Sequence, residues 1–162
     1  MLYGLFFLLF LLFKFFTFMD ETHFNFSIPI QIRMSDLDPF NHVNNGVQCS
    51  YLDLGRSAYI EEILGQQMDW LTIDLVLAHI SLDFLVPINY GDKIVCACKV
   101  TRLGNKSFSM IQQIIDTKNQ IIKTKSESVI VGLDRDKLIA IPIKQEYRDK
   151  LAAFENKHDQ NI

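Results

Sequence analysis

The chain has 162 residues, 49% of them hydrophobic, and a net charge of −3 at pH 7, which is the size and composition of one globular domain. No cluster of lysine or arginine is present, so a nucleic-acid partner is not expected. The three cysteines, Cys49, Cys96 and Cys98, are an odd set that fits a reducing, cytoplasmic setting best.

Residues 1–18 form a hydrophobic N-terminal segment that consists almost entirely of Phe and Leu. Three interpretations are open. As a membrane anchor, the segment is at the short limit of about 17 residues for a transmembrane helix. As a signal peptide, it lacks a basic start and a small-residue cleavage site. In the third interpretation the start is misassigned and the protein begins at Met19. A membrane partner is therefore expected only if residues 1–18 are expressed.

The first expected element of the domain is a strand. Apolar residues recur at every second position from Phe26 to Ile32, and Pro29 within this run indicates a sheet edge or a bulge. A long helix should then start at Asn44 or Asn45 and stop at Gly65. This helix has a wide apolar stripe, which predicts that it is mostly wrapped by other structure. The stripe comprises Val47, Tyr51, Leu52, Leu54, Ala58, Tyr59 and Ile63.

Four more strands are expected after the helix, because apolar residues alternate over about 80–86, 94–103, 108–114 and 122–133. The short polar turns between these runs imply that consecutive strands form antiparallel hairpins. Cys96 and Cys98 share one face of the second of these runs, where they are expected to be buried apolar filler rather than metal ligands. A terminal helix follows Pro142, with Ile143, Tyr147, Leu151 and Phe154 on one face. The fold class is α+β: a five-stranded antiparallel sheet curled around one long helix, with a C-terminal helix, over residues 25–155.

A polar stretch, residues 35–46, lies between the first strand and the long helix, and holds Asp36, Asp38, His42, Asn44 and Asn45. A helix N-terminus has unpaired backbone N–H groups that stabilise an oxyanion. An acid beside such a site is a minimal hydrolytic apparatus, so this stretch is the candidate active site.

Two motifs resemble the acyl-CoA thioesterases of the hotdog fold, the 4-hydroxybenzoyl-CoA thioesterase-like group: Asp36-Leu37-Asp38 with His42-Val43-Asn44-Asn45 and Tyr51-Leu52, and Asp83-Phe84-Leu85-Val86-Pro87 with Tyr90-Gly91-Asp92. The resemblance covers about Ile28 to Leu151. It implies an acyl-CoA substrate, no cofactor, and a homodimer with a continuous ten-stranded sheet, often paired again into a homotetramer. It also implies active sites at the subunit interface.

The resemblance assigns Asp38 as the catalytic carboxylate, either as nucleophile or as general base, although alone it would be a turn residue before Pro39. His42 is the second catalytic candidate, to orient Asp38, to bind substrate or to cap the loop. Asn44, Asn45 and Gly46 are expected at the substrate, with the two amides also serving as caps and loop braces, and no metal is expected. Phe40 stands where the related plant acyl-carrier-protein thioesterases carry an Asn, which departs from their pattern.

The remaining polar residues have plainer expected roles. Asp36 should brace the loop by accepting backbone N–H bonds, and the alternative is a direct role in the reaction. Asp53 and Arg56 should form an i,i+3 pair on an exposed strip, unless Asp53 faces the partner subunit and contributes to the site. Arg102, Lys106 and Lys123 should be solvated surface charges, or else contacts for CoA phosphates. The sequence therefore predicts an acyl-CoA thioesterase that releases free acid and CoA. The alternatives are an acyl-carrier-protein thioesterase or a non-hydrolytic acyl-binding protein of the same fold.

Overall fold

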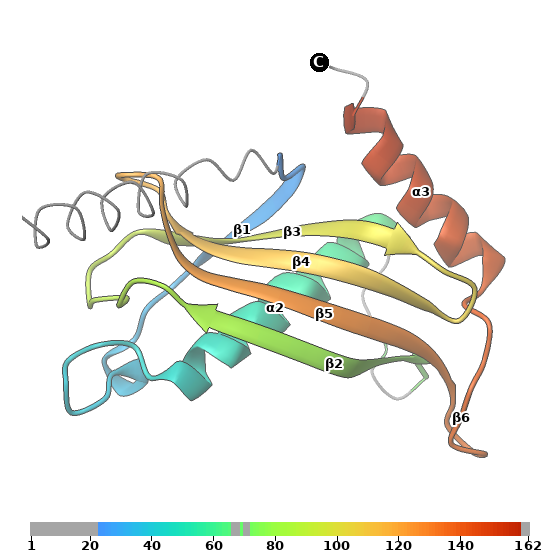
Figure 1. Ribbon diagram of the computed structural model, residues 1–162, viewed down its shortest axis with the longest axis horizontal. Helices are drawn as coiled ribbons and strands as arrows, with labels where there is room; N and C mark the ends of the chain where they lie inside the picture. The colour runs from blue at the N-terminus through green and yellow to red at the C-terminus, as the bar shows by residue number, and fades with distance from the viewer. Residues whose placement is uncertain (1–22, 66–68, 70–71, 160–162) are drawn as a thin grey trace, which may run out of the picture.

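The computed structural model describes residues 23–65, 69 and 72–159. Its main strands lie side by side in the order β1-β3-β4-β5-β2, and every neighbouring pair is antiparallel (Figure 1). The strands are β1 (Phe26–Ile30), β2 (Leu75–Phe84), β3 (Ile94–Leu103), β4 (Ser107–Asp116), β5 (Ile121–Asp134) and the short β6 (Ile139–Ala140), which pairs with β5. The helices are the 3-10 turn η1 (Met34–Asp36), α2 (Asn45–Leu64) and α3 (Gln145–Asp159). The expected α+β architecture is confirmed.

Helix α2 lies across one face of the sheet and packs on β1, β3 and β4 (Figure 1). It starts where expected, because the Asn44 side chain accepts the Gly46 N–H, and it stops at Gly65, whose φ of 68° is the left-handed conformation that glycine adopts readily. Both ends of the helix are thus set by local sequence.

The strand order contains a crossover that local pattern does not show. β2 comes directly before β3 in the chain, yet β2 pairs with β5 while β3 pairs with β1 and β4, so the hairpin expected between β2 and β3 is wrong. As a result β1 and β2 are the two edges of the sheet. Pro29 lies on β1, so the interpretation of this proline as an edge residue is confirmed, since an edge strand has one side where a missing N–H is tolerated.

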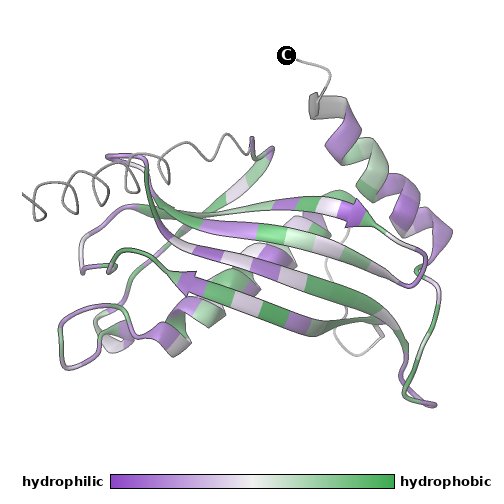
Figure 2. Cartoon of the chain, viewed as in Figure 1, coloured by the Kyte–Doolittle hydropathy of each residue, from purple (hydrophilic) through white to green (hydrophobic). Residues whose placement is uncertain are grey.

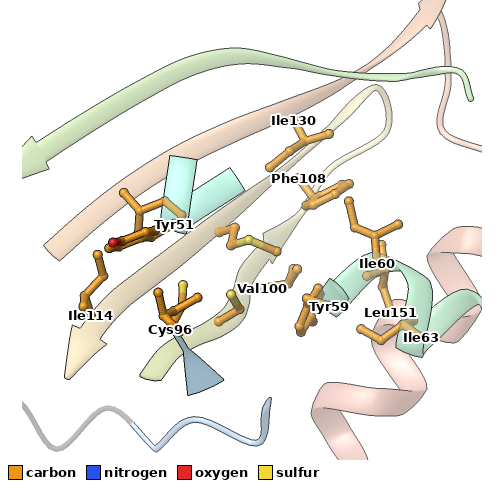
Figure 3. Close-up of a cluster of buried hydrophobic side chains, with 14 of the residues drawn as sticks. Tyr51, Tyr59, Ile60, Ile63, Cys96, Val100, Phe108, Ile114, Ile130 and Leu151 are labelled. Atoms are coloured by element: carbon orange, nitrogen blue, oxygen red, sulfur yellow. The ribbon is translucent and has the colours of Figure 1, made fainter. Parts of the chain in front are cut away.

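The core lies between α2 and the sheet. Hydrophilic and hydrophobic residues alternate along the strands (Figure 2), and Tyr51, Tyr59, Phe108 and Ile114 are among the fully buried side chains (Figure 3). Cys96 and Cys98 are 0% and 1% exposed, which confirms their expected burial.

A glycine makes the close packing of α2 against β3 possible. A Cβ atom at Gly55 would collide with the Sγ of Cys96, and it would lie in tight contact with the Cβ of Cys96 at 3.0 Å and the Sγ of Cys98 at 3.2 Å. The α2–β3 contact therefore depends on the missing side chain of Gly55, which was not singled out from the sequence.

Some sequence expectations differ from the structure. Leu54 is 56% exposed, so α2 is not wrapped on all sides; the apolar stripe is correct only for the side that faces the sheet. Strand β2 begins earlier than expected and ends before Val86, and Ile143 is buried but precedes α3. The expectations for residues 1–18 lie outside the described residues. No helix within the described part of the chain is both long and apolar enough to cross a membrane.

Candidate active site

The 35–46 stretch folds as a closed loop between η1 and α2. An isolated β-bridge between Leu37 and Val43 joins the two sides of the loop, and Asn41 turns the chain with a φ of 63°. The Asn44 N–H donates to the Asp36 carbonyl at 2.9 Å, which ties the start of α2 to the end of η1. The polar residues of the first motif are therefore held on one short loop at the N-terminus of α2.

Asp38 lies inside this loop and is half-buried. Its Oδ1 accepts the N–H groups of Phe40 at 2.9 Å and His42 at 3.3 Å, and its own N–H donates to the His42 carbonyl at 2.8 Å. Its Oδ2 accepts no hydrogen bond from any residue that the structure describes. One oxygen of the carboxylate thus orients the group, and the other remains available for chemistry.

His42 connects the first motif to the second. Its backbone forms a β-bridge with Asn89, and the neighbouring Val43 N–H donates to the Ile88 carbonyl at 2.8 Å. The imidazole is half-buried and has no hydrogen-bond partner among the described residues. Two motifs separated by about forty residues are therefore in direct backbone contact beside Asp38.

The Asn44-Asn45-Gly46 group forms the first turn of α2. Asn44 Oδ1 accepts the Gly46 N–H at 2.8 Å, so the expectation that this amide caps the helix is confirmed. Asn45 is exposed, and its N–H has no acceptor in the described part of the chain. This N–H is one of the unpaired donors of a helix start, with the positive end of the helix dipole behind it.

Asp36 is a buried brace beneath the loop. Its Oδ2 accepts the Arg33 N–H at 2.8 Å and the Tyr51 hydroxyl at 2.6 Å, and the Arg33 guanidinium lies 3.4 Å from Oδ1. Burial opposes ionisation, but the bonds from Tyr51 and Arg33 and the Arg33 charge outweigh it and hold the pKa of Asp36 below its ordinary value. Burial and the Asp36 carboxylate raise the pKa of Tyr51, so the pair is a neutral phenol on a carboxylate. The expected bracing role of Asp36 is confirmed.

The Asp53–Arg56 pair forms as expected, but the exposed strip predicted for it is wrong for Arg56. The Arg56 side chain is 9% exposed and its Nη1 donates to Gln112 Oε1 at 3.0 Å. Gln112 in turn donates to the Leu52 carbonyl at 2.8 Å. The residue spacing predicted the Asp53–Arg56 ion pair but not the burial of Arg56 against β4, because the position of Gln112 depends on how the sheet packs on α2.

The three cations near the hairpins have different environments. Arg102 is exposed and lines a cavity of about 300 Å³ with His79 and Glu127, to which no residue of the 35–46 stretch contributes. Lys106 is exposed and its Nζ donates to the Ala140 carbonyl at 2.9 Å. Lys123 is neither a solvated nor a free charge: it is buried against Asp92, which corrects the expectation for this residue.

No group of three or more His, Cys, Asp or Glu in residues 23–65, 69 and 72–159 is placed to hold a metal ion. The arrangement instead provides a carboxylate with one open oxygen and an unpaired helix N–H. Those are the parts needed to activate a nucleophile and to polarise a carbonyl group.

Comparison with known proteins gives a consistent result. The model of the thioesterase superfamily matches residues 40–123, just over half of the chain. A thioesterase from Thermus thermophilus, solved with coenzyme A and Zn, is 30% identical with a TM-score of 0.73, and the match covers 82% of this chain and 96% of that one. The chloroplastic acyl-acyl carrier protein thioesterase ATL3 of Arabidopsis thaliana is 26% identical over 144 residues, 87% of this chain and 73% of that protein. A 1,4-dihydroxy-2-naphthoyl-CoA thioesterase from Synechocystis, 15% identical with a TM-score of 0.70 over 78% of this chain and 95% of that one, shares the fold.

Proposed function

Because this chain belongs to the thioesterase superfamily and is a thioester hydrolase, we propose that it hydrolyses acyl-CoA to a free acid and CoA, with Asp38 as the reacting carboxylate. The observation that carries the proposal is the hydrogen bonding of the Asp38 carboxylate. Two loop N–H groups hold Oδ1, while Oδ2 has no partner among the described residues. An oriented carboxylate with one unoccupied oxygen is suited to take a proton or to attack a carbonyl carbon.

The chemistry suits a single carboxylate. As a general base, Asp38 takes a proton from water, the water oxygen bonds to the acyl carbon, and the C–S bond breaks. The sulfur leaves as a thiolate and then takes up the proton; since a thiol has a pKa of about 8.5, it needs no strong acid to leave. As a nucleophile, Asp38 itself bonds to the acyl carbon, and the C–S bond breaks to release the CoA thiolate; water then cleaves the resulting anhydride, which returns the Asp38 carboxylate and releases the free acid. Both routes place developing negative charge on the thioester oxygen.

The residues around Asp38 have supporting roles in this proposal. The Asn45 N–H at the helix start polarises the thioester carbonyl, together with the dipole of α2. Gly46 leaves the first turn of α2 without a side chain, so that substrate can approach the backbone. The Asn44 oxygen caps the helix, which leaves its amide N–H₂ for the acyl group. His42 is the second catalytic residue of this proposal, in which its half-buried imidazole orients Asp38 or binds the substrate.

Free-CoA release from a panel of acyl-CoAs tests the proposal. Asp38→Asn should lower kcat/KM by about 10² to 10⁴, the usual contribution of a positioned general base. Asp136→Asn, the same change in an exposed turn between β5 and β6, is the matched control and should behave as wild type. Full activity of Asp38→Asn would remove Asp38 from the mechanism. A wild-type protein that releases CoA from no member of the panel would refute acyl-CoA as the substrate.

Acyl-carrier protein is the second candidate carrier, because the Arabidopsis relative is an acyl-acyl carrier protein thioesterase. The two carriers present the same thioester, so they differ only in what the protein surface contacts beyond it. Comparing kcat/KM for one acyl group on CoA and on acyl-carrier protein separates them. A preference for the carrier protein of more than about tenfold, or 1.4 kcal/mol, would favour this second assignment.

We also propose that the active form is a homodimer, or a homotetramer built from two such dimers. β2 is a ten-residue edge strand whose outer edge has no partner strand among the described residues, and such an edge pairs readily with another chain. Val76, Leu77 and Phe84 on this strand are 37–45% exposed, which is an apolar surface that a second copy would cover. Two sheets of five strands joined at β2 would form one ten-stranded sheet. Sedimentation equilibrium of the purified chain gives the oligomeric state, and a monomer would refute the proposal.

A further inference from the structure

Lys123 is a buried cation that the proposed chemistry does not use. Its side chain, on β5, is 6% exposed, and its Nζ donates to the Pro87 carbonyl at 3.0 Å and lies 3.0 Å from Asp92 Oδ2. Asp116 Oδ2 is at 4.0 Å. A buried ammonium is tolerated only where it is paired and hydrogen-bonded. The two nearest partners both belong to residues 85–92, which we call the β2–β3 connector.

The main chain around Lys123 holds the same connector. The Lys123 carbonyl accepts the N–H groups of Leu85 at 2.9 Å and Val86 at 3.1 Å. The Asp92 oxygen that faces the ammonium also accepts the Asn89 N–H at 3.0 Å. The Asn89 bond and the Lys123 ammonium together hold the pKa of Asp92 below its ordinary value, although burial opposes this. One residue of β5 therefore ties down both ends of the connector.

The middle of the connector is in contact with the candidate active site. The Ile88 carbonyl accepts the Val43 N–H at 2.8 Å, and Asn89 forms a β-bridge with His42. His42 is in turn bonded to Asp38 in both directions, through its N–H at 3.3 Å and its carbonyl at 2.8 Å. The Lys123 ammonium is thus linked to the Asp38 carboxylate through two sets of contacts, those of the connector with His42 and Val43 and those of His42 with Asp38.

We propose that Lys123 is a positioning residue for the thioesterase site: its ammonium fixes the β2–β3 connector, and the connector holds His42 and Asp38 in their reacting geometry. The inference rests on the proposed role of Asp38. Without the ammonium, the Pro87 carbonyl and Asp92 lose their shared donor, and the connector loosens while α2 stays packed on β3 and β4. A displacement of about 1 Å at a reacting group costs roughly 100-fold in rate, so the effect should appear in kcat.

Steady-state kinetics of three variants test this proposal. Lys123→Met keeps most of the side-chain volume and removes the charge, and should lower kcat by about 10- to 100-fold with little change in KM. Lys123→Arg restores a cation to the same partners and should recover part of kcat. Lys93→Met removes an exposed lysine that directly follows the connector in sequence and should match wild type. Equal kcat values for Lys123→Met and Lys93→Met would overturn the proposal.

Hydrogen exchange gives a readout that does not depend on the substrate. In Lys123→Met the Val43 amide should exchange faster, while amides in the centre of β4 keep the wild-type rate. Faster exchange throughout β4 would mean that Lys123 only stabilises the fold, and would overturn the proposal. If wild type hydrolyses no thioester, the proposed function fails, and exchange at Val43 still decides the role of Lys123. Should Lys123→Met not fold, Asp92→Asn is the milder change and should show the same local effect.

Discussion

The replacement of Tyr51 by Phe removes one hydroxyl from the brace beneath the 35–46 stretch. In the native protein this hydroxyl donates to Asp36 Oδ2 at 2.6 Å, and the Asp36 side chain is only 4% exposed. The variant keeps the Arg33 N–H at 2.8 Å and the Arg33 guanidinium at 3.4 Å. Asp36 therefore loses one of three donors at a buried carboxylate.

The expected cost follows from these contacts. A hydrogen bond to a charged group contributes about 1.5–3 kcal/mol to stability. The lower end, about 1.5 kcal/mol, applies here because two donors remain and the exposed Arg33 keeps solvent near the carboxylate. For a domain of this size that corresponds to a decrease in Tm of roughly 3–6 °C.

The cost of Tyr51→Phe should depend on pH. The folded pKa of Asp36 is below its ordinary value, so this carboxylate contributes stability above the unfolded pKa of about 3.9 and loses it as pH falls through the folded pKa. The variant removes part of that contribution. The difference between wild type and Tyr51→Phe should therefore be full from pH 5 to 7 and should shrink below about pH 4.

Urea unfolding at pH 7, 5 and 3 measures this difference, with Tyr90→Phe as the control. Tyr90 is 54% exposed, so the loss of its hydroxyl should change the free energy of unfolding by less than about 0.5 kcal/mol. A Tyr51→Phe difference that is the same at pH 3 as at pH 7 would refute the reasoning, because it would show that the bond does not depend on the ionised Asp36.

Two further predictions concern α2. Gly55→Ala should lower the free energy of unfolding by about 1–3 kcal/mol, because the new Cβ collides with Cys96, although helix propensity alone would raise it by roughly 1 kcal/mol. Urea unfolding measures the change, with Ser57→Ala on the open side of the helix as the control. A stabilised Gly55→Ala variant would contradict the close packing of α2 on β3. Asn44→Ala should lower the free energy of unfolding by about 0.5–2 kcal/mol, because the Gly46 N–H loses its side-chain acceptor. Asn44→Asp keeps an acceptor oxygen and should retain most of the stability. An equal decrease in both variants would exclude capping by Asn44.

Local sequence signals predicted much of this protein because their causes are local. An amide oxygen can reach the N–H two residues on, so Asn44 marks the start of α2 whatever packs around it. The left-handed φ of Gly65 ends the helix for an equally local reason. Period-two alternation gave the strands, and the buried pair Cys96 and Cys98, because it depends only on the pleat. The candidate loop around Asp38 is likewise continuous in sequence.

The tertiary structure alone decided which strands are neighbours. Every strand has the same period-two pattern, so that pattern does not predict that β2 pairs with β5 or that β3 pairs with β1. This crossover lets the β2–β3 connector pass beside the 35–46 stretch, where Ile88 and Asn89 contact Val43 and His42. It also buries Lys123 beneath the connector, although alternation cannot distinguish a buried lysine from a solvated one. The sequence by itself determined the ends of α2, the strands and the candidate loop with Asp38, since these depend on neighbours in the chain. The contacts of this loop with the β2–β3 connector join segments that are distant in sequence, so only the tertiary structure decided them.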